Sequence, residues 1–394
     1  MLNGPFSPWP LYDEEEQQAV LAVMQSNKVN YWTGQEGREF EKEFAEFADS
    51  DYAVAVANGT VALDLCWQSL NLPKGSEVIV TSRTFIASIS SIVLAGLKPV
   101  FADLDLDTQN ITAASIEAVL TPNTSAVLCV HLAGWPCEMD DIMALADAKG
   151  LKVVEDCAQA HGAKYKGRSV GSIGHIGAWS FCQDKIMTTA GEGGMVTTND
   201  KALWQRVWSF KDHGKSFEAV YERQHPPGFR WLHESFGTNW RLTEMQSAVG
   251  RLQLRKMAKW TETRLDYATQ IWDTAQSLKG LRVPQVPAHI LHAAYKCYVF
   301  VDESALVEGW NRDRIMNEIV GRGVPCFSGS CSEVYLEKAF DGTNFRPEVE
   351  LPIAQELGHS SLMFLVHPTL TREEIQLTCE TIRAVMKEAV DECH

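Results

Sequence analysis

Short apolar runs alternate with amphipathic stretches through the N-terminal half of the chain. The apolar runs, bounded by turn residues, cover 52–57, 77–81, 99–102, 126–131, 153–156, 178–181 and 195–198. Segments 60–70 and 140–149, which lie between such runs, carry apolar residues at helical spacing. Strands that alternate with helices form a mostly parallel sheet covered on both faces, so the pattern predicts an α/β fold.

A different pattern follows these strands. The amphipathic stretch 242–272 predicts a long helix that leads out of the first unit. Beyond it, the sequence predicts a strand at 296–301 and helices at 303–322 and 371–389. We therefore expect a large domain at 1–255 and a smaller C-terminal α/β domain at 256–394.

The composition of the chain indicates which partners and which cellular compartment to expect. The chain has 394 residues and a net charge of -16, which argues against a nucleic-acid partner because phosphate backbones require a basic face. The first residues lack the basic and apolar regions of a signal peptide, and the apolar stretches are too short to span a membrane. Its 10 cysteines form no C-x-x-C pair, which is typical of reduced thiols. We expect a cytoplasmic protein without a membrane partner.

Lys185 is the candidate nucleophile. Most lysines are solvated surface charges, but this one follows the apolar run that ends at Phe181 and precedes the glycines Gly191, Gly193 and Gly194. Glycines let the backbone approach a ligand closely or turn tightly. A partly desolvated lysine at such a place is a competent nucleophile toward an aldehyde.

Two carboxylates, Glu155 and Asp156, end an apolar run upstream of this lysine. The C-terminal edge of a parallel sheet is where open α/β folds bind ligands, although an Asp there is also common as a helix cap. An amine for an aldehyde, a carboxylate for a pyridine nitrogen and small donors for a phosphate are what pyridoxal 5'-phosphate (PLP) requires. The sequence therefore predicts PLP as the cofactor.

Several ordered segments carry a resemblance to a known family. They are Trp32-Thr33-Gly34, Asn58-Gly59-Thr60, Thr84-Phe85, His131-Leu132-Ala133-Gly134, 155–162, 180–185, 191–194 and 237–241. In order and spacing the chain resembles, over essentially its whole length, the DegT/StrS family of PLP-dependent sugar aminotransferases. This resemblance implies the aspartate aminotransferase (type I) fold.

The resemblance also implies roles for individual residues around the cofactor. Lys185 would hold the aldehyde as a Schiff base, and Asp156 would pair with the pyridine nitrogen. Gln159 would lie beside the ring, near its phenolic oxygen, and Phe85 would stack on the opposite face. The phosphate would be held by groups in two segments, namely the amides of Gly59 and Thr60 at a helix N-terminus and the hydroxyl of Ser180.

Asn239 extends the expected site across two chains. In the family this residue reaches the phosphate of the neighbouring subunit, which implies a homodimer with shared active sites. Arg241 would hold that loop or an anionic substrate group. No metal is expected, because the histidines lack ligand spacing. The glycine-rich segment 171–177 precedes a strand and opens no helix, so a dinucleotide site is not expected.

The expected function is transfer of an amino group to a sugar. By resemblance, an amino acid, with glutamate as the favoured donor, aminates a nucleotide-linked ketosugar for surface polysaccharide or natural-product sugar biosynthesis. Relatives with histidine at the lysine position act as sugar dehydratases, so Lys185 favours transamination. A PLP-dependent sugar dehydratase or lyase, or a non-catalytic PLP-binding regulator, remain the alternatives; the intact Lys185, Asp156 and Ser180 argue against the regulator.

Overall fold

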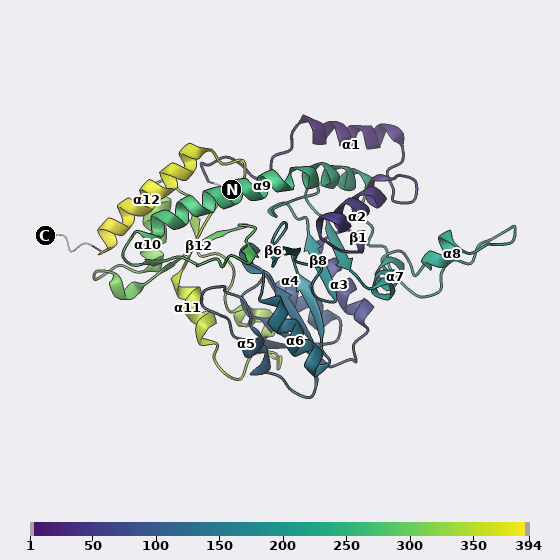
Figure 1. The fold of residues 1–394 in the computed structure, drawn as a ribbon, viewed down its shortest axis with the longest axis horizontal. Coiled ribbons are helices and arrows are strands. Elements are labelled where there is room, and N and C mark those ends of the chain that lie inside the picture. Colours follow the sequence, from purple (N-terminus) through teal and green to yellow (C-terminus); the bar gives the residue numbers. More distant parts are fainter. Residues whose placement is uncertain (1–3, 391–394) are drawn as a thin grey trace.

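A seven-stranded sheet forms the centre of the computed structural model, which describes residues 4–390 (Figure 1). Its strand order is β1-β9-β8-β5-β4-β2-β3. In that order the strands are β1 Tyr52–Val56, β9 Gly194–Thr198, β8 Ile176–Ser180, β5 Lys152–Asp156, β4 Thr124–Val130, β2 Glu77–Thr81 and β3 Lys98–Ala102. β9 is antiparallel to both of its neighbours, and β8, β5, β4, β2 and β3 are parallel to one another. The predicted mostly parallel α/β sheet is confirmed.

Helices cover both faces of this sheet. Apolar residues of α3 Gly59–Leu70, α4 Ile86–Leu94 and α6 Met139–Lys149 pack in one large core with sheet residues such as Ala178. On the other face, Phe40 and Phe44 of α2 Glu36–Phe47 and Met257 of α9 Glu244–Gln276 pack against Trp179 and Phe181. Successive residues of a strand point to opposite faces, so neighbouring side chains at the strand ends enter different environments.

The C-terminal part contains a second, antiparallel sheet of four strands in the order β10-β12-β14-β13. Its strands are β10 Leu281–Arg282, β12 Cys297–Val301, β14 Ser361–Phe364 and β13 Cys326–Phe327. Helices α10 Arg312–Gly321 and α12 Arg372–Val390 share a core with this sheet and with the second half of α9, which runs across the molecule (Figure 1).

The predicted helix at 303–322 is wrong in its first half. A single 3-10 turn, Glu303–Ala305, is followed by an irregular stretch, and α10 begins only at Arg312. Gly309 has φ +84, a left-handed conformation that breaks a helix. Asn311 then caps α10 by accepting a hydrogen bond from the Arg314 amide.

The N-terminal segment packs against the C-terminal part. Phe6 contacts the C-terminal core, and the Ser7 amide donates to Glu374 of α12 over 2.6 Å. The remaining α-helices are α1 Glu14–Ser26, α5 Ala113–Glu117, α7 Lys201–Phe210, α8 Phe217–Tyr221 and α11 Pro352–Ser360, and the remaining strands are β6 Lys164–Tyr165, β7 Arg168–Ser169 and β11 Ile290–Leu291. Within residues 4–390, no helix combines the length and apolar character needed to cross a membrane.

An arm formed by α8 and the loop after it projects from the body of the molecule (Figure 1). Large apolar side chains on this arm face solvent, with Phe229 77%, Trp231 79% and Phe236 99% exposed. Clustered apolar surface of this kind is typical of a protein-protein contact.

Candidate functional site

Asp156 is the last residue of β5, and its side chain points toward α4. The residue is 6% exposed. Ser88 of α4 donates its hydroxyl to one carboxylate oxygen over 2.8 Å, and the Ala158 amide donates to the other over 3.1 Å. Burial raises the pKa of the Asp156 carboxyl above its usual value, although these two hydrogen bonds oppose the shift. The structure thus holds a desolvated carboxylate at the carboxyl edge of the sheet.

Lys185 lies in the loop between β8 and β9. Its main-chain carbonyl accepts a hydrogen bond from the indole Nε1 of Trp9 over 2.9 Å. Its amine is 3.6 Å from a carboxylate oxygen of Asp184 and 5.4 Å from the centre of the Tyr295 ring. The side chain is 18% exposed, so the amine is accessible and yet surrounded by protein.

The N-terminus of α3 faces Ser180 at the end of β8. Asn58 caps this helix by accepting a hydrogen bond from the Val61 amide. The amides of Gly59 and Thr60 precede the first intrahelical bond, and the part of the chain that the structure describes offers them no acceptor. A Cβ at Gly59 would lie 2.5 Å from the Cβ of Ser180, so only glycine lets the helix end approach this hydroxyl. Free amides at a helix N-terminus are suited to a phosphate.

Gln159 and Phe85 lie on loops that follow two strands of the sheet. The side-chain oxygen of Gln159 accepts a hydrogen bond from the Ala133 amide over 2.9 Å, which fixes the orientation of the carboxamide. Phe85 immediately precedes α4, and it is 69% exposed. A largely exposed aromatic ring at the start of α4, the helix whose Ser88 binds Asp156, is available to stack on a planar ligand.

Asn239 is exposed on the segment that returns from the arm. This segment pairs with the loop at Asp212 through an isolated antiparallel bridge to Asn239. Arg241 donates to the buried carboxylate of Asp212 over 2.7 Å, and the indole of Trp32 donates to the other oxygen over 2.8 Å. Arg241 therefore holds the loop, which is one of the two roles expected for it.

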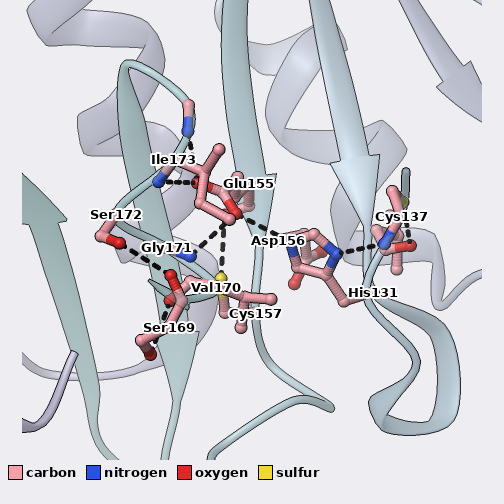
Figure 2. A network of polar contacts seen from close by, with 12 residues as sticks. His131, Cys137, Glu155, Asp156, Cys157, Ser169, Val170, Gly171, Ser172 and Ile173 are labelled. Carbon is pink, nitrogen blue, oxygen red and sulfur yellow. Dashed lines mark hydrogen bonds and ion pairs between the residues drawn. The ribbon is translucent and has the colours of Figure 1, made fainter. Parts of the chain in front are cut away.

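Glu155, the neighbour of Asp156, enters the opposite face of the sheet and binds the glycine-rich loop (Figure 2). Its carboxylate accepts hydrogen bonds from the amides of Gly171, Ile173 and Gly174 at 2.8, 2.9 and 2.6 Å, and pairs with His131 Nε2 at 2.9 Å. Burial raises the pKa of Glu155, but the His131 and amide hydrogen bonds lower it further, so the net direction is downward. The glycine-rich loop thus binds an anion of its own chain.

His131, Glu155 and Cys157 have potential ligand atoms within 4.8 Å of one another. The Nδ1 atom of His131 accepts a hydrogen bond from the Cys137 amide over 3.0 Å, so Nε2 carries the proton that is donated to Glu155 (Figure 2). Because these hydrogen bonds occupy the atoms that a metal would require, we assign the cluster a structural role.

Several contacts around the site have no signal in the sequence. Ser88 lies in an ordinary helical pattern, and Trp9 and Tyr295 are distant from Lys185 along the chain. Each reaches the site only through tertiary packing. The Thr84-Phe85 pair directly precedes α4, so the sequence indicates that this helix lies at the site. Nothing in the sequence distinguishes Ser88 from Ser91 as the partner of Asp156.

The residues present fit PLP. Asp156 ends β5, and Ser180 ends the adjacent strand β8 and faces the unpaired amides at the start of α3. Lys185 lies in the loop after β8, and its charge acts on Asp156. The close approach of Gly59 to Ser180 leaves a cradle that a Cβ would fill. These are an amine for an aldehyde, an acid for a ring nitrogen and donors for a phosphate.

Comparison with known proteins gives concordant matches over nearly the whole chain. Residues 10–383 match the model of the DegT/DnrJ/EryC1/StrS aminotransferase family. The chain is 34% identical to GDP-perosamine synthase of Escherichia coli O157:H7, with 91% of this chain and 90% of that protein covered. It is 33% identical to dTDP-3-amino-3,4,6-trideoxy-alpha-D-glucose transaminase of Streptomyces venezuelae, covering 94% and 91%.

A solved structure is more similar still. An aminotransferase from Psychrobacter cryohalolentis superposes with a TM-score of 0.97 at 61% sequence identity, covering 98% of this chain and 100% of that one.

Proposed function

The chain belongs to the DegT/DnrJ/EryC1/StrS aminotransferase family, and we propose that it transfers the amino group of an amino acid to a nucleotide-linked ketosugar. The family predicted from the sequence is thereby confirmed, together with the type of fold, the aminotransferase class and the PLP cofactor. The single observation that carries the proposal is the convergence of the Lys185 amine, the buried Asp156 carboxylate and the free N-terminus of α3.

The names of the relatives indicate the class of substrate. One is a GDP-perosamine synthase and the other a dTDP-amino-sugar transaminase. We propose glutamate as donor and, as acceptor, a ketosugar linked to a nucleotide, on a route to surface polysaccharide or a natural-product sugar.

Each proposed site residue has a distinct task. When bound, PLP supplies an aldehyde for amines and an electron-withdrawing ring. Asp156 holds a proton on the ring nitrogen, and the α3 amides with Ser180 bind and orient the phosphate. Phe85 and Gln159 would contact the ring. Lys185 would hold the aldehyde of the bound cofactor and, once its amine is free, would move the proton of the donor's α-carbon, because that amine is already beside the reacting atoms.

We propose that the working molecule is a cytoplasmic homodimer with shared sites. The exposed aromatic side chains of the arm and the exposed position of Asn239 support the dimer. The cysteines of residues 4–390 are free thiols, which agrees with a reducing compartment. The division into domains at 1–255 and 256–394 also stays a proposal.

Absorbance and covalent trapping test this assignment. The protein loaded with PLP is expected to be yellow and to lose its colour with borohydride, and peptide mass spectrometry is expected to find the reduced adduct on Lys185. Lys185→Ala is expected to lose both the adduct and turnover, whereas Lys166→Ala, a surface lysine paired with Asp140, keeps both. Full turnover by Lys185→Ala without added amines would contradict the assignment of Lys185 as the catalytic lysine.

The acceptor is identified by a second measurement. Protein in the pyridoxamine form is mixed with nucleotide-linked and free ketosugars, and return of the aldehyde-form absorbance identifies a substrate. Transamination consumes one donor for each amino sugar formed, whereas a dehydratase or lyase consumes none, so donor consumption separates the two reactions.

A further inference from the structure

The residue directly before the reactive lysine is an acid. A carboxylate oxygen of Asp184 lies 3.6 Å from the Lys185 amine, close enough for an ion pair. The Asp184 side chain is 48% exposed, so water screens the pair and its attraction is weak. A weak ion pair suits a lysine whose amine must bond to the cofactor, be released and bond again. A strong ion pair would keep the amine at Asp184.

Tyr295 holds Asp184 in place. Its hydroxyl donates to the same carboxylate oxygen over 2.6 Å, and Tyr295 itself is 8% exposed. The Tyr295 amide donates to the Ala133 carbonyl over 2.9 Å, and the Ala133 amide donates to Gln159. The Asp184 carboxylate is thus connected through two hydrogen bonds to the loop that orients Gln159 in the candidate site.

Electrostatics agree with this geometry. Burial raises the pKa of the Asp184 carboxyl, but the charge of Lys185 and the hydroxyl of Tyr295 lower it further, so Asp184 is ionised at neutral pH. The Lys296 ammonium acts in the same direction. Asp156, His161 and Cys182 also sense the charge of Lys185. Among these groups, Asp184 is the one that the structure places in an ion pair with the amine.

We propose that Asp184, fixed by Tyr295, is a positioning residue that holds the Lys185 amine beside the reacting atoms whenever the lysine is not bonded to the cofactor. The proposal rests on the aminotransferase function above. A lysine has a flexible four-carbon stem, and a fixed anion within reach restricts the free amine to one region.

The experiment uses the full chain loaded with pyridoxamine 5'-phosphate, in which Lys185 is free. The protein is pulsed with acetic anhydride across a range of pH, and acetylation of Lys185 is measured by peptide mass spectrometry. Asp184→Asn is expected to change this profile, with Lys185 acetylated severalfold faster at a given pH, because its amine is no longer held in an ion pair. Asp184→Glu is expected to reverse part of this increase, and Tyr295→Phe to give a smaller increase.

Asp107→Asn is the matched control, because it also removes an acid from a partly exposed ion pair, here with Arg282. A second readout is the half-reaction with glutamate, in which Asp184→Asn is expected to lower the limiting rate severalfold without changing KM. An unchanged labelling profile in Asp184→Asn would overturn the proposal.

The experiments distinguish a wrong proposed function from a wrong role of Asp184. If no donor amino acid or ketosugar converts the wild-type protein, the proposed function is wrong, and the labelling of directly loaded protein still decides the effect of Asp184 on the amine. If the wild-type protein turns over and its labelling profile matches that of Asp184→Asn, only the role of Asp184 is wrong.

Discussion

At the scale of single residues, Asp156 carries a charge that the folded protein holds at a cost. Because burial raises its pKa, the stability that this group contributes is present below the pKa of the unfolded chain and is lost as the pH rises through the folded value. At neutral pH the protein without cofactor therefore bears an unfavourable buried anion. A protonated ring nitrogen would offset that cost by supplying the opposite charge.

Asp156→Asn is expected to separate stability from function. The variant keeps the shape of the side chain and removes the charge, so the cofactor-free protein should become more stable at pH 7 by roughly 1 kcal/mol. The rate of the half-reaction should fall by about 1,000-fold, equivalent to several kcal/mol of transition-state stabilisation. Urea unfolding with and without PLP, and stopped-flow absorbance, measure the two effects.

One result would contradict the role of Asp156. A variant within a few-fold of the wild-type rate would mean that another acid holds the ring proton. Glu155, which occupies the opposite face of β5 and is bound by the glycine-rich loop, is not placed to replace it.

Gly59→Ala tests the cradle at the start of α3. The added methyl group would lie 2.5 Å from the Cβ and 2.9 Å from the hydroxyl of Ser180, so helix and strand must separate. We expect the Kd for PLP to rise by at least about tenfold, measured by equilibrium dialysis or fluorescence titration. Gly321→Ala is the control, since a Cβ there meets no atom within 4 Å and an alanine favours the helix. Equal PLP affinity in Gly59→Ala and wild type would exclude a phosphate at this helix end.

At the scale of elements, Glu155 joins three parts of the sheet. Its carboxylate connects the end of β5 to the 171–174 loop before β8 and to His131 after β4. The backbone amide of His131 in turn donates to the carbonyl of Asp156 over 3.2 Å. The face of β5 opposite the candidate cofactor site is therefore the one that fixes the register of the strand ends.

Glu155→Gln is expected to destabilise the fold in a pH-dependent way. The NH2 group of the glutamine side chain would face backbone N–H groups, which are themselves donors. The loss of these hydrogen bonds is expected to lower the free energy of unfolding by about 2–4 kcal/mol. Because the pKa of Glu155 is lowered in the folded state, its contribution is present above the pKa of the unfolded chain and is lost as the pH falls through the folded value. Urea midpoints should therefore differ most between wild type and variant at neutral pH and converge in acid; a constant difference across pH would contradict the assignment.

The order of the elements was predictable because each strand of the large sheet is a short apolar run between turn residues. The start of α10 was not, since it depends on the backbone of Gly309 and the capping by Asn311. In the candidate site, Asp156 at the end of β5 and Lys185 in the loop after β8 have sequence signals. Ser88, Trp9 and Tyr295 have none, because partners so distant along the chain are chosen by packing.

At the scale of the whole molecule, the arm carries apolar surface that a single chain leaves exposed to solvent. Its aromatic side chains are exposed, and Asn239 at its base is exposed as well. A two-fold dimer would bury such a surface and give each site groups from both chains.

Mixing two inactive variants tests the shared site. Lys185→Ala and Asn239→Ala should each lose turnover, the second by releasing PLP. In a heterodimer, one site would lack both groups and the other would be intact, so activity should return toward half that of a wild-type dimer. Subunit exchange is verified by native mass spectrometry; verified exchange without recovered activity would rule out the shared-site model.

The hydrogen bond from Trp9 to the Lys185 carbonyl makes the two ends of the chain interdependent. Trp9 lies against His367, and the neighbouring Ser7 is bound by Glu374 on the final helix. Ser7 and Trp9 thus reach their places only after α12 has been synthesised, although N-terminal units usually fold first. The main chain of the reactive lysine is therefore fixed only once α12 is present, and binding of the cofactor is expected to follow the synthesis of this helix.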